Sequence, residues 1–154
     1  MQMRLMPCEH TAVLKMIKCY SELSMFETFD DRFDYLKLEG IVGEETFGFD
    51  RILNQIFYKN DTWKRLRNEI IIRDNGCDLG VPGYDIEKGI IVHHMNPISV
   101  KDLEEESKYL LDPEYLICVS LKTHNAIHYG DRSLLEGRKV VERRKGDTCP
   151  WKVF

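Results

Sequence analysis

The feature that most constrains the fold of this chain is the placement of its histidines on short apolar segments. Four of the five histidines lie in residues 93–128, as an adjacent pair in "IVHHMNPI" and as a pair four residues apart in "KTHNAIHYG". The first pair ends a β-branched run, which predicts a strand at residues 89–95. A second short strand is predicted at residues 115–120. The second pair lies between Thr123 and Gly130, which predicts a short helix capped at both ends.

This strand, loop, strand, helix unit can bring imidazoles together. His124 and His128 are four residues apart on the predicted helix, so they face one side and are candidate ligands of one metal ion. His93 and His94 should point to opposite faces of a strand unless the strand breaks, and Asn96-Pro97 supplies such a break. One imidazole can then bind the metal while the other takes a proton from water, as phosphodiester hydrolysis requires. The alternative is a hydrogen-bonded pair with a structural role only.

Length and composition indicate one globular domain. The chain has 154 residues, of which 43% are hydrophobic and 31% charged, enough to bury a core. No segment reaches the roughly 20 apolar residues that span a bilayer, and no signal peptide is evident. The five cysteines are scattered without a Cys-x-x-Cys pair, which favours free thiols in a reducing compartment. We therefore expect a soluble, cytoplasmic protein.

The net charge of −4 disfavours nucleic-acid binding at first sight, but the charge is unevenly distributed. Residues 51–76 carry 6 basic and 3 acidic side chains, a net charge of +3. Residues 118–154 carry 8 basic and 4 acidic side chains, a net charge of +4. The first segment precedes the four histidines and the second contains His124 and His128. Both are consistent either with a basic face that binds phosphates or with a solvated surface of mixed charge.

Helical spacing of apolar residues accounts for most of the remaining chain. It predicts helices over residues 11–28 and 30–40, and two more over 51–76 that are separated by a break. The second helix of that pair has an apolar stripe of Trp63, Leu66, Ile70 and Ile71. Residues 96–114 are predicted to form a long, partly acidic connection. Residues 131–154 are predicted to form a tail that ends in an extended piece, with Trp151 packed against the body.

The histidine unit resembles the core of the HNH endonucleases, whose fold is the ββα-metal finger. The resemblance rests on "VHHMNPI" followed by "DPEYLICVSLKTHNAIHYG", and on the upstream "FYKNDTWKRLRNEIIIRDNGC", which is similar to the basic helix that often precedes that core. It spans about half of the chain, residues 57–130, and joins these features in order: Trp63, Arg67, Arg73-Asp74, His93-His94, Pro97, Asp112-Pro113, His124, His128 and Gly130. The pattern is similar to small bacteriophage proteins that are often encoded near DNA-packaging genes.

The resemblance implies a role for each of the four histidines. His93 matches the first metal ligand of the family, and His94 matches the general base. His124 matches the second metal ligand, and His128 matches a histidine that is a ligand in some members only. The implied cofactor is one divalent ion, Mg²⁺, Mn²⁺, Zn²⁺ or Ni²⁺. Imidazole ligands suit Zn²⁺ and Ni²⁺, whereas Mg²⁺ prefers oxygen.

The chain departs from the family pattern at two places. Tyr115 stands where the family has the asparagine that steadies the loop between the strands, so backbone groups or the Tyr115 hydroxyl would have to take over. Many phage members also carry a zinc knuckle of four cysteines. Cys77 matches one of these, but Gly80, Ser120 and Thr123 occupy the other three positions, so we expect no structural zinc.

These features predict an α+β protein with a ββα-metal finger core at residues 55–130. A helical extension at residues 1–54 and a basic tail at residues 131–154 would flank that core. The implied function is metal-dependent cleavage or nicking of DNA. The alternative is a non-catalytic HNH-fold module that binds DNA or a phage or host protein.

DNA is the partner that the resemblance implies, with phage DNA-packaging proteins as further candidates and no role for a membrane. The expected location is the cytoplasm of a bacterial host. Candidate phosphate contacts, which would position the DNA backbone without reading its sequence, are the basic side chains of the two positive segments: Lys64, Arg65, Arg67, Arg73, Arg132, Arg138, Arg143 and Arg144.

Overall fold

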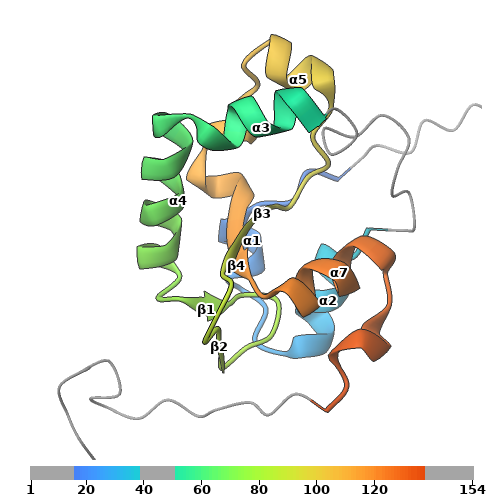
Figure 1. Cartoon of the computed structure of the whole chain (residues 1–154). Helices are drawn as coiled ribbons and strands as arrows, with labels where there is room; N and C mark the ends of the chain where they lie inside the picture. Colours follow the sequence, from blue (N-terminus) through green and yellow to red (C-terminus); the bar gives the residue numbers. More distant parts are fainter. Residues whose placement is uncertain (1–15, 39–50, 138–154) are drawn as a thin grey trace, which may run out of the picture.

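The centre of the molecule is an antiparallel pair of strands with helices packed on both faces (Figure 1). The computed structural model describes residues 16–38 and 51–137. The central strands are β3 (Ile91–His94) and β4 (Leu116–Val119). Helices and strands are thus mixed within one structure, so the α+β class predicted from the sequence is confirmed.

The remaining elements are short and surround this strand pair. A second antiparallel pair is formed by β1 (Cys77–Asp78) and β2 (Tyr84–Asp85). The helices, in chain order, are α1 (Tyr20–Leu23), α2 (Phe29–Leu36), α3 (Arg51–Lys59), α4 (Asp61–Arg73), α5 (Val100–Glu104), α6 (Lys108–Leu111) and α7 (Leu121–Tyr129), with 3-10 turns η1 (Pro113–Tyr115) and η2 (Arg132–Leu135).

One face of the strand pair packs against α4. The side chain of Asn60 caps this helix by accepting a hydrogen bond from the Thr62 amide. The apolar stripe predicted from the sequence faces the strands, with Ile71 at its edge. The buried residues of this cluster are Trp63, Leu66, Ile70, Val92, Leu116 and Cys118.

The opposite face packs against α7 and against the N-terminal helices. Alternating residues of the two strands point to this side, as the twofold period of a strand requires. The buried residues of this second cluster are Leu23, Tyr35, Leu36, Met95, Ile117, Val119 and Ile127. The described part of the predicted N-terminal extension therefore shares a core with the histidine-bearing elements.

The helix predicted over residues 11–28 is much shorter in the part that the structure describes. Only Tyr20–Leu23 is helical, and residues 16–19 are not. Distant side chains bind the backbone that would otherwise continue the helix. The Lys18 amide donates to Asn96 Oδ1 (2.9 Å), and the Cys19 amide donates to the Tyr35 hydroxyl (2.7 Å).

The structure differs from the sequence prediction in two further details. The connection predicted at residues 96–114 contains two short helices, α5 and α6, which were not predicted. Helix α5 begins with a capping box in which Ser99 and Asp102 bind each other's backbone amides. Helix α7 is capped by Ser120 rather than by Thr123, since the Ser120 hydroxyl accepts from the Thr123 amide. At the other end Gly130 adopts the left-handed conformation expected of a helix C-cap (φ 63°).

No helix among the described residues is both long enough and apolar enough to cross a bilayer. The prediction that Trp151 anchors the tail falls outside the described residues.

Candidate metal centre

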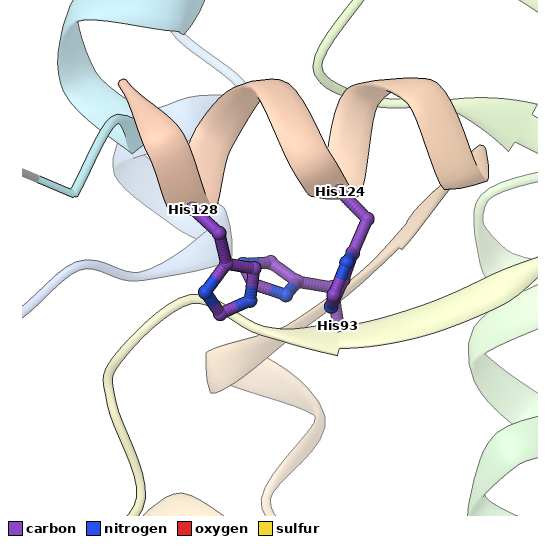
Figure 2. A group of neighbouring side chains, drawn as sticks. All are labelled: His93, His124 and His128. Carbon is purple, nitrogen blue, oxygen red and sulfur yellow. The ribbon is translucent and has the colours of Figure 1, made fainter. Parts of the chain in front are cut away.

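Three histidines from two elements converge on one face of the central strands (Figure 2). His93 points from β3 toward α7, and His124 and His128 project from one side of α7 toward it. The centroids of the His124 and His128 rings are 4.3 Å apart. The His93 ring lies 5.2 Å from each and is nearly perpendicular to both, at 87° and 80°.

The arrangement fits a single metal ion. One ring nitrogen from each histidine lies within 4.8 Å of the other two. Nitrogen ligands about 2.0–2.1 Å from a tetrahedral ion would be about 3.3 Å apart, so small side-chain rotations suffice. His93 Nε2 is buried and has no hydrogen-bond partner among the described residues, whereas buried polar atoms in proteins nearly always have one. An ion at this position would satisfy it.

The environment keeps these imidazoles neutral, which is the form that binds metals. Burial, followed by the neighbouring His124 and His128, holds the pKa of His93 well below its usual value of 6.5. Burial, followed by His124, lowers the pKa of His128 to about 4. Burial also lowers the pKa of His124, partly opposed by a hydrogen bond to Asn125. The three ligands therefore need not lose protons to accept an ion at neutral pH.

His94 lies on the other face of the strand pair, against α4. Its ring stacks on Trp63 at 5.4 Å and 18°, and Phe57 lies 6.2 Å away. His94 Nε2 is 3.0 Å from the carbonyl oxygen of Leu110. A carbonyl only accepts, so Nε2 carries the proton and Nδ1 keeps its lone pair. Burial lowers the pKa of His94 to about 4, partly opposed by the hydrogen bond to Leu110.

The adjacent histidines are thus separated by the regular geometry of β3. His93 pairs with Ile117 and His94 with Leu116 in an unbroken ladder. The bend supplied by Asn96-Pro97 comes after both histidines and does not turn His94 toward the cluster. His94 is the last residue of β3. Only a molecule bound at the end of this strand would therefore lie near both faces of the strand pair.

The loop after β3 is held in place although Tyr115 stands where the resemblance places an asparagine. The Met95 amide donates to the backbone carbonyl of Tyr115 (3.0 Å). Asn96 Nδ2 donates to the Lys18 carbonyl (2.8 Å). The backbone carbonyl of Tyr115 and the side chain of Asn96 therefore hold the loop in place. Neither Lys18 nor Asn96 was predicted from the sequence to hold this loop. The Asn-Pro dipeptide signalled a turn, but nothing near Lys18 indicated its distant partner.

Three of the four positions that the resemblance assigns to a zinc knuckle, Gly80, Ser120 and Thr123, come together around one carboxylate, whereas the Cys77 thiol lies 3.4 Å from Asp85 Oδ1. Asp78, next to Cys77, is buried and accepts hydrogen bonds from the amides of Gly80 (3.1 Å) and Ser120 (3.0 Å) and from the Thr123 hydroxyl. These bonds join the β1 segment to the first turn of α7. Asp78 thereby fixes the helix that carries His124 and His128.

Gly80→Ala is expected to lower the free energy of unfolding by about 1–3 kcal/mol, as overpacking usually does. A Cβ at Gly80 would lie 2.5 Å from Thr123 Cγ2 and 3.3 Å from Asp78 Oδ1. Thr123 cannot rotate away without losing its bond to Asp78. Urea unfolding measures the change, with Gly89→Ala as the control. Gly89, unlike Gly80, has positive φ (70°), but no described atom lies within 4 Å of a Cβ there, so the control substitution adds backbone strain without overpacking. Equal stability of Gly80→Ala and the native chain would contradict the packing argument.

Several predicted phosphate contacts have partners inside the protein. Arg73 binds both carboxylate oxygens of Asp74 (2.7 and 3.1 Å) and donates to the carbonyls of Pro113 and Leu116. Arg73 therefore links α4 to Asp74 and to the backbone that enters β4, and its role as a phosphate contact stays a prediction. Arg67 donates to the Ile90 carbonyl (3.0 Å).

The other predicted contacts are more exposed. Arg132 lies on the surface beside α2 and binds Asp30 (2.6 Å). Lys64 is exposed and paired with Asp61 (3.0 Å), and Arg65 is exposed on the same helix. Three of the predicted contacts lie outside the described residues: Arg138, Arg143 and Arg144.

Acidification is expected to destabilise the metal-free protein between pH 6.5 and pH 4. The pKa values of His94 and His128 are about 4 in the folded chain, against 6.5 for an ordinary histidine. In this window the unfolded chain binds more protons than the folded chain, so stability rises with pH and is lost as pH falls. Urea midpoints at pH 7 and pH 5 in chelator measure the loss. His128→Gln should lessen it, and an unchanged midpoint would contradict the burial of these rings.

Comparisons of the chain with protein-family models, with curated proteins and with solved structures found no match.

Proposed function

We propose that the protein is a metal-dependent DNA endonuclease or nickase of the HNH type, with its ββα-metal unit formed by β3, β4 and α7. The observation that carries the proposal is the convergence of three neutral imidazoles, one of which, His93, has a buried Nε2 with no hydrogen-bond partner within the described part of the chain. The order of the elements and the positions of the histidines agree with the resemblance of the sequence to that family.

Each histidine has a distinct task in this proposal. His93, His124 and His128 hold the ion. Their burial disfavours protonation of the imidazoles, which would compete with metal binding. When bound, the ion supplies Lewis-acid stabilisation of the negative charge on the phosphate and on the departing 3′ oxygen. His94 accepts a proton at Nδ1 from the water that attacks phosphorus, while Nε2–H stays bonded to Leu110 and fixes the orientation of the ring.

The substrate must lie at the end of β3 for these tasks to be combined. The phosphodiester would sit beyond His94, where the two faces of the strand pair meet. A pKa of about 4 makes the free His94 a weak base. An anionic phosphate beside the ring favours the protonated form and so raises that pKa when substrate is bound.

A plasmid assay tests the proposal directly. The full chain, stripped of metal by mild chelation, is incubated with supercoiled plasmid and with Mg²⁺, Mn²⁺, Zn²⁺ or Ni²⁺ in turn. We expect nicking or linearisation that chelator abolishes, and no more than one tightly bound transition-metal ion per chain by elemental analysis. No cleavage with any of these ions, despite stoichiometric binding, would refute the enzymatic proposal. Two tightly bound ions per chain would contradict the prediction that the chain has no structural zinc site.

A non-catalytic binding module is the second candidate. The enclosure of His94 between Trp63 and Leu110 favours it, because a core histidine would look the same. Such a module would bind duplex DNA without cutting it. The affinity should then fall with salt at a log–log slope of about −0.9 per phosphate neutralised. A slope near zero would point instead to a protein partner.

A further inference from the structure

Two tyrosines and a lysine lie together on the surface just before β4. The rings of Tyr109, in α6, and Tyr115, in η1, meet edge to face, with centroids 4.8 Å apart and an interplanar angle of 66°. The Lys108 ammonium lies 5.4 Å from the centroid of the Tyr109 ring and 5.8 Å from that of the Tyr115 ring. Lys108 is exposed, and both tyrosines are half-buried. These three residues are called the tyrosine–lysine patch below.

The charge of this patch is not neutralised within the described part of the chain. The Lys108 ammonium forms no ion pair and no hydrogen bond with the described residues, and the two ring contacts are its only interactions there. Both contacts are close to the limit of about 6 Å for a cation–π interaction, so they hold the ammonium only weakly. The ammonium is therefore available to a ligand, and the exposed parts of two aromatic rings lie beside it.

The tyrosine–lysine patch lies beside the end of β3 that carries His94. Tyr109 precedes Leu110, whose carbonyl oxygen is 3.0 Å from His94 Nε2. The Tyr115 carbonyl accepts a hydrogen bond from the Met95 amide (3.0 Å). Each tyrosine is thus part of, or next to, a backbone group that binds His94 or the residue after it. A molecule at the end of β3 would have the patch as its neighbour.

We propose that the tyrosine–lysine patch binds an unpaired nucleotide of DNA, with the base against the tyrosine rings and a phosphate on Lys108. Sites for single strands combine aromatic rings, on which bases stack, with cations that follow the backbone. The bases of a duplex stack on one another, so these rings can be used only where a strand is unpaired. The position of this nucleotide next to the cleaved bond rests on the proposed function, whereas its binding does not.

The charges around the patch confine the phosphate contact to Lys108. The chain between α5 and α6 is acidic, with three successive glutamates at residues 104–106, of which Glu105 pairs with Lys101 (3.6 Å). These carboxylates repel a nucleic-acid backbone that would run over α5. The site should therefore combine stacking, which depends little on salt, with about one phosphate contact. One such contact contributes about −0.7 to the log–log salt slope of single-strand binding.

A purely structural role for the two rings makes a different prediction. Tyr109 packs against a small apolar cluster that contains Ile98 and Leu110. If packing were its only role, substitution of Tyr109 would lower the stability of the fold and leave the affinity for an oligonucleotide unchanged in the folded protein. Substitution of the exposed Lys108 would then change neither property.

The experiment uses the full chain, in chelator so that no DNA is cut. Fluorescence anisotropy measures the affinity, at several salt concentrations, for a labelled oligothymidylate, for an abasic strand of the same length and for a duplex of that length. The variants are Lys108→Met, Tyr109→Leu and Tyr115→Leu, together with Tyr109→Phe and Tyr115→Phe, which keep the rings. The matched control is Lys122→Met, because Lys122 is also exposed but lies beyond Val119, at the opposite end of the strand pair from His94. Thermal unfolding checks that each variant is folded.

The native chain should bind the oligothymidylate more tightly than either the duplex or the abasic strand. Leucine at either tyrosine should weaken binding of the oligothymidylate about 5- to 100-fold, the usual contribution of one stacked base, while phenylalanine should keep most of the affinity. Lys108→Met should make the salt slope less negative by about 0.7, and Lys122→Met should leave it unchanged.

Three results would overturn the proposal: no binding of the oligothymidylate, equal affinity for the abasic strand, or an unchanged salt slope in Lys108→Met. The abasic strand and Lys108→Met decide the matter even where a leucine variant does not fold.

Plasmid cleavage separates this inference from the proposed function. If the native chain and the variants show the expected affinities but the native chain cuts no DNA with any of the four metal ions, the endonuclease proposal fails and the nucleotide site stands. If the native chain cuts DNA but the variants bind the oligothymidylate as the native chain does, the nucleotide site fails and the endonuclease proposal stands.

Discussion

His94→Ala is expected to slow single-turnover plasmid cleavage by about 10²- to 10⁴-fold, the usual contribution of a positioned general base, while metal affinity stays nearly unchanged. The reason is the separation of the adjacent histidines. His94 lies against Trp63 and binds Leu110, whereas His93 belongs to the three-histidine cluster. Loss of the His94 imidazole therefore removes the proton acceptor and leaves the three ligands in place. Added metal should not restore the rate.

His93→Ala and His124→Ala should behave differently from His94→Ala. Each removes one ligand nitrogen, so metal affinity and cleavage should fall together, and excess metal should restore part of the activity. Calorimetric metal titration and single-turnover cleavage on all three variants make the comparison. Thermal unfolding checks that each variant is folded, and His94→Gln controls for the lost bond to Leu110. Metal loss in His94→Ala but not in His93→Ala would reverse the assigned roles. Unchanged cleavage in all three would mean that the histidines are structural.

Arg73→Met is expected to lower the free energy of unfolding by about 3–5 kcal/mol, as the removal of one partner of a buried ion pair usually does. The side chain of Asp74 is fully buried, and its Oδ2 also accepts a hydrogen bond from the Cys118 amide (2.7 Å). Without Arg73 this carboxylate would be buried without the guanidinium that pairs with it. The variant would also lose the contact of the guanidinium with the Tyr20 ring, 3.8 Å from its centroid.

Urea unfolding measures this loss, with Lys64→Met as the control. Lys64 pairs with Asp61 on the surface of the same helix, so its removal should cost about 0–1 kcal/mol. Asp74→Asn in the Arg73→Met background should recover part of the stability, because an amide oxygen can still accept from Cys118 without a buried charge. A loss below 1 kcal/mol for Arg73→Met would show that the pair contributes little, and Arg73 would remain a candidate phosphate contact.

The parts of the fold that follow from local pattern were predictable from the sequence. The β-branched run before His93 and the apolar run before Ser120 are strands, and the four-residue spacing places His124 and His128 on one face of a helix. The stripe that begins at Trp63 faces the core as predicted. These features depend on residues that are near one another in the chain, so periodicity and caps suffice to find them.

The parts that depend on distant partners were not predictable. Residues 16–19 were assigned to a helix because their own spacing is helical, yet Asn96 and Tyr35 bind their backbone instead. Arg73 looked like a surface cation of a basic helix, but it pairs with a carboxylate that also accepts a hydrogen bond from the backbone of the neighbouring strand. Asp78 likewise carries no local signal, because its partners Ser120 and Thr123 are more than 40 residues away. Tertiary contacts outweighed local preference at each of these positions.

The register of the unbroken ladder between β3 and β4 determines which of the two adjacent histidines faces α7. In a strand pair, a slip of one residue turns every side chain to the opposite face. In most strands such a slip would bury polar groups, but here one histidine would replace the other. His94 would face the ligands of α7, and His93 would face Trp63. An imidazole would still complete the cluster, and yet Nδ1 of His94 would no longer be available as a base. The bond from Cys118 to Asp74 and the bond from Met95 to Tyr115 both oppose this slip. The alignment of two short strands thus selects which of two identical side chains faces the candidate metal centre.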